Sequence, residues 1–271
     1  MLTPKQIKEL FQAHHREPNR ALGQNFLVDV AARDRIAAAV PADGNPVLEI
    51  GPGLGALTQA LCGNSRRVVA VELDRFLAAH LTRELCPRCP GLTVAEGDIL
   101  KTDLAGFFAG PWHAAGNLPY YITTPILERL LLLLPLSLTF LMQREAAPRL
   151  LAGPGDKLYG PVPVFCALYY YAQVVADLAP HSFYPPPEVH SRAIHLAKRA
   201  DHPAADPAAF FAFLETIFAQ RRKTLLNNLA VANVPRARVQ DFLVQSGIYS
   251  GVRAENLPFE QILLLYNAIC N

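Results

Sequence analysis

A short apolar segment that runs into a glycine-rich turn constrains the fold of this chain most strongly. Residues 47–50 have the composition of a buried strand, residues 51–55 are Gly-Pro-Gly-Leu-Gly, and residues 56–61 favour a helix. Glycines at alternate positions allow a sharp turn and a close approach of the backbone to a ligand. The start of the helix then offers free N–H groups to a carboxylate-like group. The Gly-x-Gly-x-Gly spacing differs from that of dinucleotide sites, so it favours another small ligand.

Polar side chains stand at the ends of three further candidate strands. Glu72 ends an apolar segment about 20 residues after the turn, where a carboxylate can accept both hydroxyls of a ribose. Asp98 follows the next segment and can accept a hydrogen bond from the amino group of a cofactor adenine. Asn117 ends a fourth apolar segment. Because ligands of open α/β sheets bind at the carboxyl ends of the strands, these side chains predict one shared site.

The tetrapeptide Asn117-Leu118-Pro119-Tyr120 suits a flat ring that carries an exocyclic amino group. The Asn117 side-chain oxygen can accept one N–H and the Leu118 carbonyl the other, while Pro119 has no N–H to compete. The Tyr120 face can stack on the ring. When two acceptors bind the two N–H groups of an adenine amino nitrogen, the nitrogen lone pair becomes available to attack a methyl group. Catalysis would then rest on positioning and fixed dipoles. Taken alone, the tetrapeptide favours an ordinary turn with a buried tyrosine; the other strand ends favour the adenine site.

With these segments the chain resembles the S-adenosylmethionine-dependent rRNA adenine N6,N6-dimethyltransferase family, and within it the bacterial branch that modifies small-subunit rRNA. The similarity covers nearly the whole chain. Its more specific motifs are Leu-Gly-Gln-Asn-Phe-Leu at 22–27, Phe-Tyr-Pro-Pro-Pro at 183–187, Gln-Arg-Arg-Lys-Thr at 220–224 and Arg-Ala-Glu-Asn-Leu at 253–257. The glycine turn is less specific, because many methyltransferases share it.

The resemblance implies S-adenosyl-L-methionine as the cofactor and a set of residues that bind it. These residues are Asn25, Leu27, Gly51, Gly53, Gly55, Glu72, Asp98 and Asn117. In the family pattern Asn25 and Leu27 close over the cofactor, and Gly51 contacts its methionine part. Glu72 then contacts the ribose and Asp98 the adenine.

The resemblance also implies how the target adenosine is held. Asn117, Leu118 and Pro119 would serve the amino group, and Tyr120 and Phe183 would sandwich the flipped base. Many members of the family have Asn directly after the Tyr of the tetrapeptide. This chain has Tyr121 there, so we expect no further polar contact from that position.

Residues 22–198 alternate strand and helix patterns, as expected for a parallel sheet with helices on both faces. Later strands are expected at 138–142, 172–178 and 193–197. The resemblance implies a Rossmann-like class I methyltransferase domain with a seven-stranded, mostly parallel sheet, in which the last two strands form an antiparallel edge pair.

The two ends of the chain have other patterns. Residues 1–21 have a weak pattern, and we expect this N-terminal arm to become ordered only with RNA or cofactor. Residues 199–271 predict a small all-helical, RNA-binding domain. Its expected helices span residues 208–229, 236–246 and 258–269.

Basic residues form local clusters in a chain whose overall charge is nearly balanced. The net charge is only +2, so the chain is not a generally basic nucleic-acid binder. Arg144 follows the strand at 138–142, and Arg221, Arg222 and Lys223 lie within the helix expected at 208–229. A solvated surface explains any one of these positions as well as RNA contact does. Together with an adenine site they predict contacts to the phosphates of a structured RNA.

Composition excludes some other classes of protein. The longest apolar run, residues 130–142, contains Pro135 and is too short to span a bilayer. Charged residues interrupt the N-terminus, so no signal peptide is expected and the prediction is a cytoplasmic protein. Cys86 and Cys89 have C-x-x-C spacing, but a zinc site needs two more ligands nearby. We therefore expect no metal, with loop thiols or a disulfide at this position, and a monomeric protein.

Three alternatives stay open. A DNA adenine methyltransferase can use a tetrapeptide related to residues 117–120. A large-subunit rRNA methyltransferase shares the cofactor motifs. A largely non-enzymatic ribosome-assembly factor on the same scaffold would bind RNA without methyl transfer. Leu118, the opening motif and the C-terminal motifs favour an rRNA enzyme over a DNA methyltransferase. The motifs at 183–187 and 253–257 favour a small-subunit over a large-subunit rRNA enzyme.

Overall fold

The structure, a computed structural model, describes residues 1–270, and these residues form two compact units. The first unit contains Met1–Leu130, Pro135–Ala147 and Ala172–Ala197. The second contains Leu131–Leu134, Pro148–Tyr171 and the chain from Lys198 onward. The second unit therefore includes segments that lie within the predicted domain 22–198, although its longest segment begins next to the predicted boundary.

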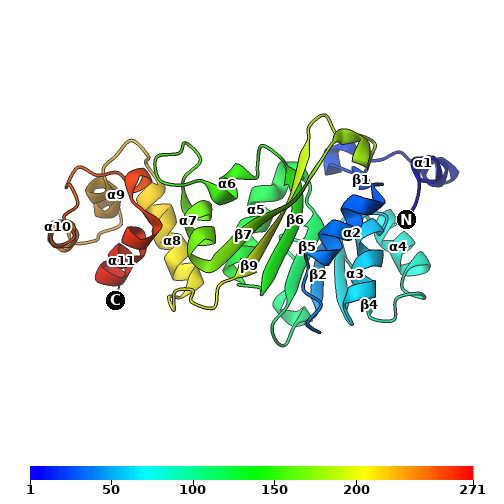
Figure 1. Cartoon of the computed structure of the whole chain (residues 1–271), viewed down its shortest axis with the longest axis horizontal. Helices are drawn as coiled ribbons and strands as arrows, with labels where there is room; N and C mark the ends of the chain where they lie inside the picture. Colours follow the sequence, from blue (N-terminus) through cyan, green and yellow to red (C-terminus); the bar gives the residue numbers. More distant parts are fainter. Residues whose placement is uncertain (271) are drawn as a thin grey trace. The chain divides into compact units, whose positions relative to one another are not determined.

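A seven-stranded sheet of order β4-β3-β2-β5-β6-β9-β7 forms the centre of the fold (Figure 1). The strands are β2 (Val47–Ile50), β3 (Val68–Glu72), β4 (Leu92–Glu96), β5 (His113–Asn117), β6 (Ser137–Gln143), β7 (Tyr170–Leu178) and β9 (Ser191–Lys198). Strands β2 to β6 pair in parallel, and β9 runs antiparallel to β6. The predicted seven-stranded, mostly parallel sheet is confirmed.

The helices of the first unit cover this sheet. They are α2 (Val30–Ala38), α3 (Ala56–Asn64), α4 (Arg75–Glu84) and most of α5 (Thr123–Leu132). Ile36 of α2 and Leu61 of α3 pack in one core with Val47 and Val68 of the sheet. All four residues of β2 are buried, which is typical of a parallel strand covered on both faces.

The N-terminal arm is folded, so the expectation that it orders only with a ligand is wrong for residues 4–13. Helix α1 (Pro4–Ala13) begins with a capping box in which Thr3 and Gln6 bond reciprocally. Its buried residue Phe11 contacts the rings of Phe26 and Phe76 at 5.7 Å between centroids. Few apolar residues mark this helix, and its stability comes from these contacts with distant parts of the chain.

A second, two-stranded sheet links two of the family motifs. Strand β1 (Phe26–Leu27) pairs antiparallel with β8 (Phe183–Tyr184), and Leu27 stands opposite Phe183. The opening motif and the proline-rich segment thus lie side by side. Short 3-10 helices occupy several connections: η1 (Arg20–Leu22), η2 (Ala105–Phe107), η3 (Tyr120–Ile122), η4 (Pro180–Ser182) and η5 (Ala254–Asn256).

The second unit is mainly helical. It contains α6 (Pro148–Leu151), α7 (Pro161–Tyr169), α8 (Pro207–Phe218), α9 (Leu225–Val231), α10 (Arg236–Gln245) and α11 (Phe259–Cys270). Phe165 of α7 stacks on Tyr169 and contacts the rings of Phe210 and Phe211 of α8. These aromatic contacts explain why α7 belongs to this unit. Helices α10 and α11 agree with the expected helices to within a residue or two.

The single helix expected at 208–229 is wrong, because α8 ends at Phe218 and α9 starts at Leu225. Thr224 caps α9 by accepting from the backbone N–H of Asn227. The side-chain amide of Asn228 donates to the carbonyls of Ile217 and Gln220 at the break between the two helices. Across the described residues, no helix is both long and apolar enough to cross a membrane.

Candidate cofactor and target-base site

A cavity lies at the carboxyl ends of the parallel strands, where the polar strand ends predicted a site. It encloses about 1030 Å³, including its open mouth. The predicted cofactor residues that line it are Asn25, Leu27, Gly51, Gly53, Glu72, Asp98 and Asn117. Most of the remaining lining is apolar, as is usual for sites that bind small organic molecules. Residues far apart in the sequence are therefore brought together as expected.

The glycine turn at residues 51–55 needs glycine for two separate reasons. Gly51, Gly53 and Gly55 all have φ between 59° and 79°, a region that residues with side chains rarely adopt. A Cβ on Gly55 would also lie 2.3 Å from Leu85 Cδ1, so this glycine allows α3 to pack closely. Gly55 does not line the cavity; it precedes α3 as its N-cap.

Glu72 is buried at the end of β3 and supports the glycine turn directly. Its Oε2 accepts from the Gly53 N–H at 3.0 Å, and its Oε1 accepts from the Asp74 N–H at 2.9 Å. Burial raises the pKa of its carboxyl. Each carboxylate oxygen can accept more than one hydrogen bond, so a diol at the cavity wall can still bond to Glu72.

Asn117 lines the cavity and keeps one side-chain acceptor unpaired. Its amide nitrogen donates to the backbone carbonyl of Asn25 at 3.0 Å, while its Oδ1 is buried and has no partner among the described residues. Asp98 lies after β4, where Oδ1 accepts from the Leu100 N–H at 2.9 Å. A buried acceptor without a partner is costly, which makes Asn117 Oδ1 a candidate to accept from a donor of a bound ligand.

Glu49 is a cavity residue that the motif reasoning missed. It lies within β2, is 1% exposed, and its Oε2 has no hydrogen-bond partner among the described residues. Burial raises the pKa of the Glu49 carboxyl to about 8, and the nearby Glu72 carboxylate contributes to this shift. The available signal was an acidic residue in an otherwise apolar strand, directly before the glycine turn.

The aromatic residues at the site are arranged differently from the predicted sandwich. Phe183 is only 3% exposed and packs in the core with Leu27, because β8 pairs with β1. Tyr120 bonds through its hydroxyl to Ser191, at 2.6 Å between Oη and Oγ. Neither ring lines the cavity, whereas the neighbouring Tyr121 does and is 55% exposed.

The backbone of the tetrapeptide is held firmly. The N–H of Leu118, a buried residue, donates to the carbonyl of Leu141 in β6 at 2.9 Å. Pro119 lines the cavity and accepts through its carbonyl from the Thr123 hydroxyl at 3.1 Å. These bonds hold the segment on either side of the Leu118 carbonyl.

The sequence profile of the ribosomal RNA adenine dimethylase family matches residues 15–271. The chain belongs to this family. A relative from Acidobacterium capsulatum, named ribosomal RNA small subunit methyltransferase A, is 40% identical over 256 residues, 92% of this chain and 90% of the relative. A relative of the same name from Geobacter sulfurreducens is 40% identical over 257 residues, 91% of this chain and 93% of the relative.

Two solved structures have the same fold. A dimethyladenosine transferase from Plasmodium falciparum matches with a TM-score of 0.70 and 24% identity, covering 89% of this chain and 97% of that chain. The 23S rRNA methyltransferase ErmE matches with a TM-score of 0.68 and 28% identity, covering 91% of this chain and all of that chain. These matches confirm the Rossmann-like methyltransferase fold with a helical C-terminal part.

The cofactor of this family is S-adenosyl-L-methionine, and the cavity fits it. The unpaired acceptor Asn117 Oδ1 suits a ligand that carries N–H donors. Glu72 suits ribose hydroxyls, and the left-handed glycine turn leaves room for the backbone to approach a carboxylate at the start of α3. The enzyme is a methyltransferase that depends on this cofactor.

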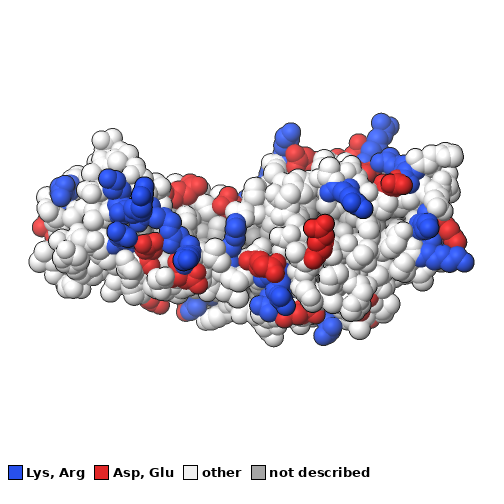
Figure 2. Space-filling view, turned by 90° about the horizontal axis from the view of Figure 1, so that it is seen from above, with Lys and Arg blue, Asp and Glu red and all other residues white. Residues whose placement is uncertain are grey.

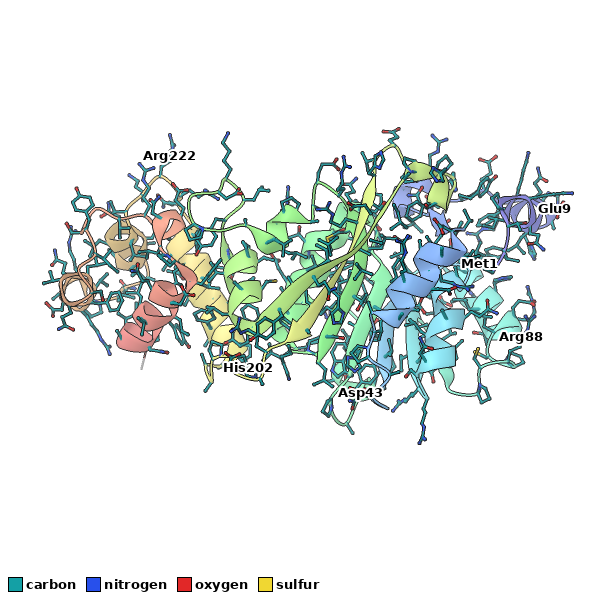
Figure 3. All side chains as sticks on the ribbon, viewed as in Figure 1. Met1, Glu9, Asp43, Arg88, His202 and Arg222 are labelled. Atoms are coloured by element: carbon teal, nitrogen blue, oxygen red, sulfur yellow. The ribbon has the colours of Figure 1, made fainter. Side chains whose placement is uncertain are left out.

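The basic residues predicted to bind RNA fall into two groups. Arg221 is engaged within the protein: its guanidinium pairs with Glu255 Oε2 at 2.8 Å and donates to the carbonyls of Lys157 and Tyr159. Arg222 and Lys223 are exposed in the turn between α8 and α9, and no ion pair with another described residue engages their side chains. Figure 3 shows Arg222 pointing away from the ribbon.

Figure 2 shows basic side chains gathered over the part of the molecule at the left, where Figure 1 draws α8 to α11. Arg144 lies in the first unit, exposed directly after β6, where its backbone N–H donates to the His190 carbonyl at 2.9 Å. Of the four predicted RNA-contact residues, Arg221 is the one whose side chain is paired within the described part of the chain, whereas the side chains of Arg144, Arg222 and Lys223 make no ion pair with a described residue.

The C-x-x-C segment packs beside a third cysteine. Cys62, Cys86 and Cys89 are partly buried against the core of the first unit, and all are free thiols. Burial and the neighbouring Cys89 thiol raise the pKa of Cys62. Within residues 1–270, no group of three or more His, Cys, Asp or Glu side chains is arranged to hold a metal ion.

Proposed function

We propose that this protein transfers methyl groups from S-adenosyl-L-methionine to the N6 amino groups of two adjacent adenosines near the 3′ end of small-subunit (16S) rRNA. The product is N6,N6-dimethyladenosine, made during ribosome biogenesis. The observation that carries the proposal is the buried, unpaired Oδ1 of Asn117 in the cavity of a chain that is 40% identical to small-subunit rRNA methyltransferases. Such an acceptor suits the exocyclic amino group of an adenine.

The chain's own residues act on the target by positioning it. Asn117 Oδ1 and the Leu118 carbonyl accept the two N–H groups and stabilise the positive charge that develops on the nitrogen. The Tyr120 face holds the flipped base, and Phe183 would join it only if its ring became exposed. The bound cofactor supplies an electrophilic methyl group. The excess proton then leaves to water, so no strong base is needed.

The cofactor is held by the strand ends in this proposal. Glu72 accepts the ribose hydroxyls, and Asp98 accepts from the adenine amino group. Gly51 and Gly53 approach the methionine part through their backbone, while Asn25 and Leu27 close the mouth of the cavity. Gly55 contributes by letting α3 pack closely rather than by contact.

The RNA is held outside the cavity. Arg222 and Lys223 are exposed and unpaired with described residues, which supports phosphate contacts from the helical region 199–271, and Arg144 adds one near the end of β6. We propose that the substrate is a pre-30S particle, that the enzyme acts as a monomer, and that it works in the cytoplasm.

A second candidate substrate is large-subunit rRNA, favoured by the structural similarity to a 23S rRNA methyltransferase at 28% identity. The curated relatives at higher identity carry the small-subunit name, which supports the first candidate. The intact cavity residues support an enzyme over a non-enzymatic assembly factor.

The test supplies purified protein and labelled S-adenosylmethionine with hypomethylated small subunits, large subunits or duplex DNA, using Asn117→Ala as the control. Digested RNA is analysed by mass for mono- and dimethyladenosine. Dimethyladenosine only in small-subunit RNA, and absent with the variant, is the expected result. Label in large subunits or DNA would identify the alternative substrate, and RNA binding without any transfer would identify an assembly factor.

A further inference from the structure

Ser191 carries a fully buried hydroxyl and does not line the cavity. It is the first residue of β9 and is 0% exposed. Its backbone stands opposite Gln143 at the end of β6, in the antiparallel ladder between these strands. The sheet therefore fixes the position of the Ser191 hydroxyl beside the carboxyl end of β6.

The partner of this hydroxyl is Tyr120 of the tetrapeptide. The Tyr120 Oη and Ser191 Oγ atoms lie 2.6 Å apart, a short hydrogen bond between two hydroxyls. Tyr120 follows β5, whereas Ser191 begins β9, and β6 lies between these two strands. The bond thus spans two strand positions and ties the tetrapeptide to the start of β9.

A tether at the hydroxyl restricts the orientation of the Tyr120 ring. A tyrosine ring has two side-chain torsions, and a fixed Oη together with a fixed Cα leaves little freedom in either. Leu118 and Pro119 are already held by hydrogen bonds to Leu141 and Thr123. The hydroxyl bond adds the constraint on the ring itself.

We propose that Ser191 is a positioning residue that holds the Tyr120 ring in the orientation needed to stack on the target adenine. This inference rests on the proposed function. It also assigns the Tyr120 hydroxyl to a structural bond, so Tyr120 takes no part in proton transfer. Burial raises the pKa of this hydroxyl, which agrees with a neutral, hydrogen-bonded phenol.

The test measures single-turnover methyl transfer to hypomethylated small subunits by wild type, Ser191→Ala, Tyr120→Phe and the double variant. Each single change should lower the rate about tenfold, the effect of one lost hydrogen bond. The double variant should be no slower than Tyr120→Phe, because both changes remove the same bond. Ser191→Thr keeps the hydroxyl and should retain most of the rate.

Separate measurements distinguish positioning from general stability. The Kd of S-adenosylmethionine, measured by calorimetry, should stay within about twofold of wild type in every variant, since Ser191 does not line the cavity. Ser137→Ala is the matched control: it removes another buried serine hydroxyl, which bonds to His113 at 2.8 Å at the start of β6. It should lower the melting temperature without changing the rate.

Several results would overturn the inference. A wild-type rate in Ser191→Ala, or additive losses in the double variant, would show that Ser191 does not act through Tyr120. If Ser191→Ala does not fold, a full rate in Tyr120→Phe would overturn it equally well. A wild-type protein that methylates no RNA would reject the proposed function itself, and this inference with it.

Discussion

The side-chain amide of Asn117 donates to the backbone carbonyl of Asn25 at 3.0 Å, across 92 positions of the chain. This bond occupies the nitrogen of the amide and leaves Oδ1 as the buried, unpaired atom. The opening motif at residues 22–27 therefore sets the orientation of the acceptor at the end of β5. The opening motif and the end of β5 thus act as one unit.

We expect Asn117→Ala to lower the single-turnover rate of methyl transfer about 10² to 10³-fold, because it removes an acceptor aimed at developing charge. The rate is measured with labelled S-adenosylmethionine and small subunits. Asn64→Ala, an exposed change at the end of α3, serves as the control and should have no effect. An unchanged rate in Asn117→Ala would contradict the assignment of this acceptor.

Glu72→Gln should weaken binding of S-adenosylmethionine by at least about tenfold, since charge-assisted bonds to the ribose become neutral ones. Calorimetry gives the Kd directly. The melting temperature is recorded as well, because Glu72 also accepts from Gly53 and Asp74. Glu84→Gln, on the surface of α4, is the control, and equal affinities in both variants would speak against a ribose contact.

Substitution of Arg221 should lower stability, whereas substitution of Arg222 should weaken RNA binding. Arg221→Ala loses the pair with Glu255 and three carbonyl contacts, so the free energy of unfolding should fall by about 1–2 kcal/mol. Arg222→Ala should leave stability unchanged, weaken RNA binding, and reduce the salt dependence of binding by about one phosphate contact. Denaturant melts and binding titrations at several salt concentrations measure both, and a stable Arg221→Ala would refute the contrast.

Glu49 should make the cofactor-free protein less stable as pH rises. The pKa of its carboxyl is about 8 in the folded protein and ordinarily 4.5, so the folded state binds the extra proton between these values. The free energy of unfolding should therefore fall between about pH 4.5 and pH 8, by up to about 5 kcal/mol. Glu49→Gln should lack this contribution; parallel pH profiles of the two proteins would contradict it.

Local patterns predicted much of the fold because their physical causes are local. Alternating strand and helix segments imply a parallel sheet, and a parallel sheet brings the carboxyl ends of its strands to one edge. Glu72, Asp98 and Asn117 could therefore be assigned to one site from the sequence alone. The prediction of one helix over residues 208–229 was wrong because the interruption of that helix depends on a contact that leaves no local pattern. Its apolar periodicity continues, but the break after Phe218 depends on Asn228, whose amide bonds to Ile217 and Gln220 carbonyls.

By itself, the sequence predicted alternating strands and helices and most of the polar residues around the cavity, since glycine geometry, apolar periodicity and motif spacing act over short stretches of chain. The resemblance of its motifs implied the family and the seven-stranded sheet. Only the tertiary structure decided which side chains are free. Arg221 is engaged by Glu255, 34 positions away, and the Tyr120 hydroxyl by Ser191, 71 positions away. A hydrogen bond between distant residues leaves no local pattern, so the partner becomes known only when the chain is folded.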